Sequence, residues 1–223
     1  KINDLFTFYK SQADFDGDLL LRPTGLIGGG VMSLDKANVS ADLFTYNANW
    51  FGSDTASLQV FKEGGSLAFR AKDLKTHIDL VMREGIFNSN GPGSYVELPA
   101  NQYISYIDKL RWVMDESLTL GDEFGGGEGS KFVSIHPLQD SLSFLAKTAF
   151  YSLKDYIIHA GGVNDILIAD AKIYPDSGIV TIAKDALIET LYGANIIADD
   201  LMQYHKFTDA TVDIQSAFNY TAS

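Results

Sequence analysis

The chain has 223 residues, of which 46% are hydrophobic and 21% charged, so it can bury a sizeable core. Its formal net charge of -12 disfavours nucleic acid, because affinity for phosphate backbones comes from clustered Lys and Arg side chains. It has no apolar run long enough to span a bilayer and no cysteine, which excludes disulfides, thiolate nucleophiles and cysteine-ligated zinc.

The first residues, KINDLFTFYK, contain neither a methionine nor a signal-peptide pattern, and the sequence stops in FNYTAS just after a strand-like run. This predicts an excised or processed piece of a longer protein.

Alternation of apolar and polar residues is the strongest signal along the chain. It occurs in three clear sets: Leu67, Phe69 and Ala71; Ile78, Leu80 and Met82; and Val212, Ile214, Phe218 and Tyr220. Because successive side chains of a strand point to opposite faces, each set predicts a strand with one buried face.

Glycine and proline separate the alternating runs. The turn signals are residues 62–65 (KEGG), 83–85 (REG), 90–93 (NGPG), 161–162 (GG) and 175–178 (PDSG). Short spacing between such turns favours antiparallel neighbours. The predicted fold is therefore all-β and mainly antiparallel, with stacked strand-turn-strand units in a β-groove, jelly roll or sandwich and at most one or two short helices.

In two segments the spacing of apolar residues fits both a helix and a strand. Residues 101–115 (NQYISYIDKLRWVMD) place Tyr103, Ile107, Leu110 and Met114 at helical spacing, with Asn101 as a possible N-cap. Alternation also fits the segment, with Ile104 and Tyr106 followed by Leu110, Trp112 and Met114, so a helix and two strands both stay open. Residues 195–204 (NIIADDLMQY) are ambiguous in the same way.

The glycine-rich residues 121–130 (GDEFGGGEGS) offer no side chains that could build a core, so they predict a loop. We expect either one β-rich domain over residues 1–223 or two intimate halves, about 1–120 and 131–223, on either side of this loop.

A short internal likeness relates the two halves. SLAFRAK (66–72) matches SLSFLAK (141–147) at five of seven positions, and VTIAKDALIETLYGANIIA (180–198) has a looser version of the pattern. The likeness indicates either a repeated strand-turn-strand unit or a chance match between two amphipathic strands.

The pattern in LSFLAKTAFYSLKDYIIHAGGVNDILIADAKIYPDSGIVTI (142–182) resembles the strand-turn-strand units of the OstA-like family, which comprises periplasmic lipopolysaccharide-transport proteins, and of the related AsmA/TamB-like groove proteins. It also resembles internal segments of long exported proteins of Bacteroidota. The resemblance covers residues 141–197 best and residues 24–90 more loosely. It implies an extracytoplasmic β-groove or jelly-roll scaffold, with an apolar interior that could shield acyl chains, and supplies no catalytic residues.

Residues 14–18 hold the best metal candidate, because Asp14, Asp16 and Asp18 gather three carboxylates around Gly17. A solvated turn is the alternative interpretation. The four histidines, His77, His136, His159 and His205, lie in no metal-ligand motif, although His136 with Asp140 could form a pair.

The aromatic group of Tyr46, Trp50 and Phe51 could stack on sugar rings or line a lipid groove, but packing between sheets explains most aromatics equally well. We single out Trp50, because turn-like residues surround it. The glycine clusters 25–30 and 125–129 lack Gly-Lys-Ser/Thr, so they predict turns or bulges rather than phosphate loops.

Residues 166–182 (ILIADAKIYPDSGIVTI) contain Asp170 and Asp176, and the pattern predicts a hairpin rather than an acidic site. Leu167, Ala169, Ala171 and Ile173 would form its apolar face, Asp170 and Lys172 would face solvent, and Pro175 to Gly178 would form its turn.

No catalytic, cofactor or metal motif is present, so we expect a non-enzymatic extracytoplasmic β-scaffold, a segment of a periplasmic, envelope or cell-surface protein. Its candidate partners are lipid or another envelope protein. The alternative is a carbohydrate-binding or adhesive β-sandwich, for which dependence on calcium and independence of it both stay open. A hydrolase would require polar groups that converge in a cleft, which the sequence does not indicate.

Overall fold

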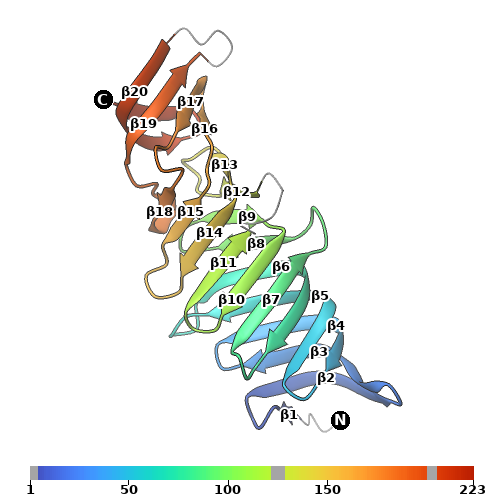
Figure 1. The fold of residues 1–223 in the computed structure, drawn as a ribbon. Helices are drawn as coiled ribbons and strands as arrows, with labels where there is room; N and C mark the ends of the chain where they lie inside the picture. Colours follow the sequence, from blue (N-terminus) through green and yellow to red (C-terminus); the bar gives the residue numbers. More distant parts are fainter. Residues whose placement is uncertain (1–4, 122–128, 200–204) are drawn as a thin grey trace. The chain divides into compact units, whose positions relative to one another are not determined.

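The computed structural model describes residues 5–121, 129–199 and 205–223 (Figure 1). Strands make up 65% of the structure, and no helix within the described residues reaches seven residues. The short 3-10 turn η1 (Lys184–Ala186) interrupts the strands. The predicted all-β, mainly antiparallel class is confirmed.

The chain forms two compact units. The first comprises Lys1–Val96 and Lys109–Asp115, and the second comprises Glu97–Asp108 and Glu116–Ser223. Gly121 and Ser130 both belong to the second unit, and most of the predicted glycine-rich loop, residues 122–128, lies outside the described part of the chain.

The first unit is an antiparallel meander in which each strand from β1 to β7 pairs with the next, and β10 then pairs with β7 (Figure 1). Its strands are β1 (Phe6–Phe8), β2 (Ala13–Arg22), β3 (Gly25–Leu34), β4 (Ala37–Tyr46), β5 (Trp50–Phe61), β6 (Leu67–Asp79), β7 (Glu84–Ser89) and β10 (Lys109–Val113). The strand β8 (Tyr95–Leu98) crosses the unit boundary at Val96. This arrangement matches the stacked strand-turn-strand prediction.

One face of this meander forms an aromatic core. Phe15, Phe44, Phe51, Phe69 and Phe87 are fully buried. Phe44 makes edge contacts with the rings of Phe15 and Phe51, at centroid distances of 6.3 and 5.7 Å. Burial of each such ring stabilises the fold by roughly 2–3 kcal/mol. The interior is thus filled by the protein's own side chains.

Glycines allow β2, β3 and β4 to approach closely. Gly17 faces Gly30 in the β2–β3 register, and a Cβ at Gly30 would lie 2.2 Å from the carbonyl oxygen of Asp16. A bulge between Gly28 and Gly30 shifts the β3–β4 register. The glycine cluster 25–30 therefore includes the predicted bulge, but it lies inside a strand rather than in a turn.

The second unit contains three strand groups. Its strands are β9 (Tyr103–Tyr106), β11 (Ser117–Gly121), β12 (Ser130–Ser134), β13 (Ser143–Ala146), β14 (Thr148–Ser152), β15 (Ile158–Gly161), β16 (Ile166–Ile168), β17 (Ala171–Tyr174), β18 (Val180–Ile182), β19 (Leu191–Ala198), β20 (His205–Ser216) and β21 (Asn219–Ala222). The groups run β11-β14-β15-β18, β9-β12-β13 and β16-β17-β19-β20-β21. The last is a separate five-stranded sheet, drawn in orange and red in Figure 1.

The alternative of a helix over residues 101–115 is wrong, because this segment forms β9 and β10. The predicted alternation holds for Leu110, Trp112 and Met114, which are buried. It has the wrong phase in β9, where Tyr103 and Ser105 are buried and Tyr106 is exposed. Asn101 caps no helix and is fully buried. Of the other ambiguous segment, residues 195–198 end the strand β19, and residues 200–204 lie outside the described part.

Residues 166–182 do form a hairpin, but its turn lies at residues 169–170 rather than at the predicted residues 175–178. β16 pairs with β17 across a turn at Ala169 and Asp170, whereas the Pro175–Gly178 turn leads from β17 into β18 of another sheet. The inserted turn reverses the expected alternation, so Ile166, Ile168, Ala171 and Ile173 are buried and Leu167 is 51% exposed. Asp170 and Asp176 are both exposed, as predicted.

Turns also end two of the predicted alternating sets early. Met82 and Phe218 are 70% and 71% exposed, because each lies in a turn after its strand. The turn after β6 occupies residues 80–83 rather than 83–85, since Asp79 Oδ1 accepts hydrogen bonds from the backbone of Val81 and Met82, both at 2.8 Å. Of the remaining residues of both sets, Ile78, Leu80, Val212 and Ile214 are buried as predicted, and Tyr220 is half-buried.

The two similar segments, residues 66–72 and 141–147, share buried positions but belong to strands of different length and pairing. Phe69 and Ala71 in β6 are buried, as are the matching Phe144 and Ala146 in β13. However, β6 has 13 residues and pairs on both sides, while β13 has four and pairs with β12. Both members are thus amphipathic strands that share these buried positions, and whether they form a repeated unit stays a prediction.

Candidate functional site

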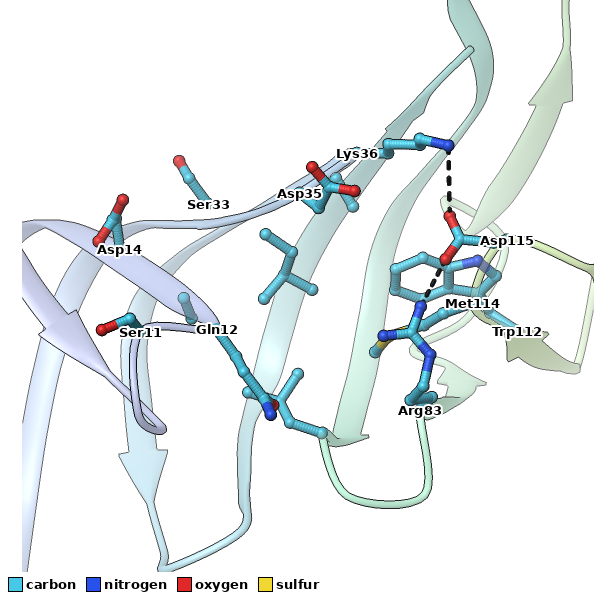
Figure 2. A pocket seen from close by; sticks show the side chains of 14 residues that line it. Ser11, Gln12, Asp14, Ser33, Asp35, Lys36, Arg83, Trp112, Met114 and Asp115 are labelled. Carbon is cyan, nitrogen blue, oxygen red and sulfur yellow. Dashed lines mark hydrogen bonds and ion pairs between the residues drawn. The ribbon is translucent and has the colours of Figure 1, made fainter. Parts of the chain in front are cut away.

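The main candidate site is a cavity of about 380 Å³ in the first unit (Figure 2). Four connections line it: the β1–β2 turn, the β3–β4 turn, the turn after β6 and the end of β10. The lining residues are Ser11, Gln12, Ala13, Asp14, Ser33, Leu34, Asp35, Lys36, Ala37, Leu80, Arg83, Trp112, Met114 and Asp115.

The sheet of this unit curls, and the curl brings these turns together. Tyr9, in the β1–β2 turn, donates its hydroxyl hydrogen bond to the carbonyl oxygen of Trp50, at the start of β5 (2.8 Å). The Tyr9 ring also lies 6.1 Å from that of Phe51. Burial raises the pKa of Tyr9 to about 12, so the hydroxyl keeps its proton and its role as donor to a higher pH than an unperturbed tyrosine does.

A small ion-pair network forms one wall of the cavity. Figure 2 shows Lys36 and Arg83 converging on the carboxylate of Asp115 from different turns. The Lys36 Nζ lies 4.0 Å from Asp115 Oδ1 and 3.4 Å from Glu63 Oε1. The backbone N–H of Met114 donates to the carbonyl oxygen of Arg83 (3.0 Å), which ties the same two segments together. These contacts hold the wall in place.

The floor of the cavity is apolar. Leu80, Trp112 and Met114 are 6%, 3% and 9% exposed, and Leu34 is half-buried. The indole Nε1 of Trp112 is buried without a hydrogen-bond partner in the described part of the chain. An apolar floor beneath a charged rim is the usual arrangement of a binding cavity, since the floor contributes affinity and the rim contributes orientation.

The opposite rim carries two carboxylates that form no ion pair within the described part of the chain. Asp14 and Asp35 are exposed, and Asp14 accepts a hydrogen bond from the Thr7 hydroxyl (3.2 Å). Asp35 has no hydrogen-bond or ion-pair partner among the residues that the structure describes. The carboxylate of Asp115 is thus paired with two cationic side chains, whereas the carboxylate of Asp35 is not paired within the described ranges.

The three carboxylates predicted as a metal candidate do not converge. Asp14, Asp16 and Asp18 lie on β2, alternate with Phe15 and Gly17, and are all exposed. The described residues contain no group of three or more His, Asp or Glu side chains that could hold a metal ion. The segment is a solvated strand face rather than the solvated turn that was the alternative.

The predicted aromatic group is divided between two environments. Phe51 is fully buried, and Tyr46 stacks on Phe8 at 5.1 Å, so both contribute to the core. Trp50 is half-buried and lies 4.6 Å from the exposed His77, measured between ring centroids. The other histidines, including His136 and His159, make no metal cluster within the described ranges.

Sequence reasoning missed most of this cavity. Lys36, Arg83 and Asp115 carry no motif, and Asp115 was part of the ambiguous helix segment. Their convergence depends on the curl of the sheet, which has no local signal. Asp14 was singled out, but for metal binding with Asp16 and Asp18.

A second, open hollow of about 790 Å³ lies in the first unit. Asp18, Asp42, Lys72 and Asp73 line it beside small residues such as Gly29. Bulges in the β3–β4 and β5–β6 pairings lie at this hollow. It lacks an apolar floor, so it is a weaker candidate for a binding site than the cavity.

Comparisons with protein-family models, curated proteins and solved structures find no match to this chain. The resemblance to OstA-like and AsmA/TamB-like units stays a prediction from the sequence. Among the described residues, no helix is long and apolar enough to cross a membrane.

Proposed function

We propose that this chain is a non-enzymatic β-scaffold segment of an extracytoplasmic envelope or surface protein, and that it binds a partner at the cavity of the first unit. The cavity carries the proposal, because it combines an apolar floor of Leu80 and Met114 with an exposed charged rim. The strand-turn-strand pattern supports the scaffold role and the extracytoplasmic setting.

Partner binding fits the geometry better than lipid shielding. The interior of the first unit is occupied by fully buried rings such as Phe15, Phe44 and Phe87, which leave an acyl chain no room among them. The cavity of about 380 Å³ is of a size suited to one side chain or a small ligand.

Methionine methyl groups provide a direct test. With 13C-methyl methionine, Met114 reports on the cavity, while the buried Met32 and the exposed Met82 serve as internal references. Addition of a chemically diverse set of fragments and short peptides should shift the Met114 resonance selectively. The variant Ser33→Trp, which fills the cavity from its wall, should abolish the shift. Ser40→Trp, at an exposed site on β4 that does not line the cavity, should preserve it.

The proposal fails if no probe moves Met114 selectively. It also fails if Ser33→Trp and Ser40→Trp behave alike while both variants remain folded. Lipid extraction of the purified protein followed by mass spectrometry tests the alternative that the chain shields acyl chains. That alternative requires an acyl lipid that co-purifies with the protein.

A carbohydrate-binding module is the second candidate, and the pair of Trp50 and His77 favours it. Their rings lie 4.6 Å apart on the protein surface, with an interplanar angle of 42°, and an exposed aromatic face can stack on a sugar ring. A glycan array should then show binding that Trp50→Ala removes. Binding that is unchanged in Trp50→Ala would reject this candidate.

A further inference from the structure

The charges around the cavity are unequally paired, which points to the kind of group it would bind. Its rim has three carboxylates, Asp14, Asp35 and Asp115, and two cationic side chains, Lys36 and Arg83. Both cationic side chains already contact Asp115. The charge that remains uncompensated is therefore negative and lies at Asp35 and Asp14.

The floor next to these carboxylates suits an aliphatic chain. Leu34, Leu80 and Met114 present methyl and thioether groups and no charged atoms. A lysine or arginine side chain has a hydrocarbon stem that packs on apolar surface and a cationic end that reaches a carboxylate. Floor and rim together match such a side chain. An anionic group would have to approach Asp35 and compete with Asp115 for Lys36 and Arg83.

The charge of the whole chain acts in the same direction. A net charge of -12 attracts cationic partners at long range and repels anionic ones, which raises the rate of encounter. The negative electrostatic field of the chain therefore favours the approach of a basic polypeptide over that of a neutral one.

We infer that the cavity takes a lysine or arginine side chain of a partner polypeptide, with the stem on Leu80 and Met114 and the cationic end at Asp35. This inference rests on the proposed partner binding at the cavity and adds the chemistry of the partner. The exposed carboxylates make the contact weak and dependent on salt concentration.

Four short capped peptides test the inference, each with a central lysine, arginine, norleucine or glutamate. Titrations followed at the Met114 methyl should show binding of the lysine and arginine peptides, weaker binding of the norleucine peptide, and none of the glutamate peptide. Asp35→Asn should weaken the affinity for the lysine peptide about two- to fivefold, which is the contribution of one exposed ion pair. Asp16→Asn is the matched control, because Asp16 is an exposed carboxylate on β2 outside the cavity.

The outcomes separate this inference from the proposed function. Equal binding of the lysine and norleucine peptides, preferred binding of the glutamate peptide, or equal effects of Asp35→Asn and Asp16→Asn would overturn the inference and leave partner binding intact. Butylamine has the chain and cationic end of lysine without a peptide backbone. If it binds as tightly as the lysine peptide, the claim that the partner is a polypeptide is overturned. The absence of any Met114 shift with peptides and fragments alike would overturn both.

Discussion

The side-chain amide of Asn101 donates a hydrogen bond to the carbonyl oxygen of Ile182 (3.0 Å), 81 residues further along the chain. The same nitrogen lies 2.8 Å from the carbonyl oxygen of Tyr156 and 3.1 Å from that of Ala183. Asn101 is fully buried, and its NH2 group, which carries two hydrogens, lies within hydrogen-bond distance of three carbonyl oxygens around the end of β18. Asn101 therefore joins distant segments of the second unit.

Substitution of Asn101 should destabilise the protein strongly. Asn101→Ala removes the donor to the Ile182 carbonyl, a buried hydrogen bond, and both part-buried contacts, and we expect the free energy of unfolding to fall by about 2–4 kcal/mol. Asn101→Asp should be at least as harmful, because it places a carboxylate against three carbonyl oxygens. Urea denaturation measures both changes. Asn195→Ala, at an exposed site on β19 of the same unit, is the control, and an equal loss in it would contradict the assignment.

Two tyrosines should respond differently to removal of the hydroxyl group. The Oη of Tyr46 is buried without a partner in the described residues, so Tyr46→Phe should leave stability at neutral pH unchanged or slightly raised. Tyr9→Phe loses the bond to Trp50 and should cost about 1 kcal/mol. A clear loss of stability in Tyr46→Phe would contradict the structure of the aromatic core.

The same tyrosines predict loss of stability at high pH. Burial raises the pKa of Tyr9 to about 12 and that of Tyr46 further. In the unfolded chain, tyrosine ionises near pH 10. The folded state therefore holds its protons longer, and its stability is complete below about pH 10 and falls as pH rises above that value. Urea denaturation at neutral pH and at about pH 11 should show a smaller decrease in Tyr46→Phe than in the parent.

Gly30→Ala should disrupt the contact between β2 and β3. The new Cβ would lie 2.2 Å from the carbonyl oxygen of Asp16 and 2.7 Å from the Cα of Gly17, so the strands must separate. We expect a loss of about 1–3 kcal/mol in the free energy of unfolding. Gly161→Ala is the control, because its nearest contact is 3.4 Å to the Thr148 hydroxyl. Comparable stability of the two variants would argue against the register of β2 and β3.

Asp176→Asn should leave stability within about 0.5 kcal/mol of the parent, because the side chain is an exposed turn residue. Thermal denaturation measures the change. A large destabilisation, or a lost binding activity, would show that Asp176 has a role beyond the turn.

Local alternation made the class of fold predictable from the sequence. Phe69, Ala71, Ile78 and Val212 all face the core as their spacing indicates. Errors arose where a turn interrupted the period, as at Ala169 and Met82. A two-residue turn reverses which positions face inward, and periodicity alone does not reveal it.

The candidate site was much less predictable than the fold. Asp35, Arg83 and Asp115 come from three connections that meet because the sheet curls, and no spacing in the sequence encodes that meeting. Asp14 stood out because it has acidic neighbours, but the extended strand keeps Asp14, Asp16 and Asp18 in a row on one exposed face. The missing information was long-range geometry rather than residue type.

The most direct measurement is the nuclear Overhauser effect between the side-chain methylene protons of a bound lysine peptide and the methionine methyl groups of the protein. The account predicts cross-peaks to the Met114 methyl, which lines the cavity, and none to the exposed Met82 or the buried Met32. Cross-peaks to Met82 alone, or a bound peptide without contact to Met114, would contradict it.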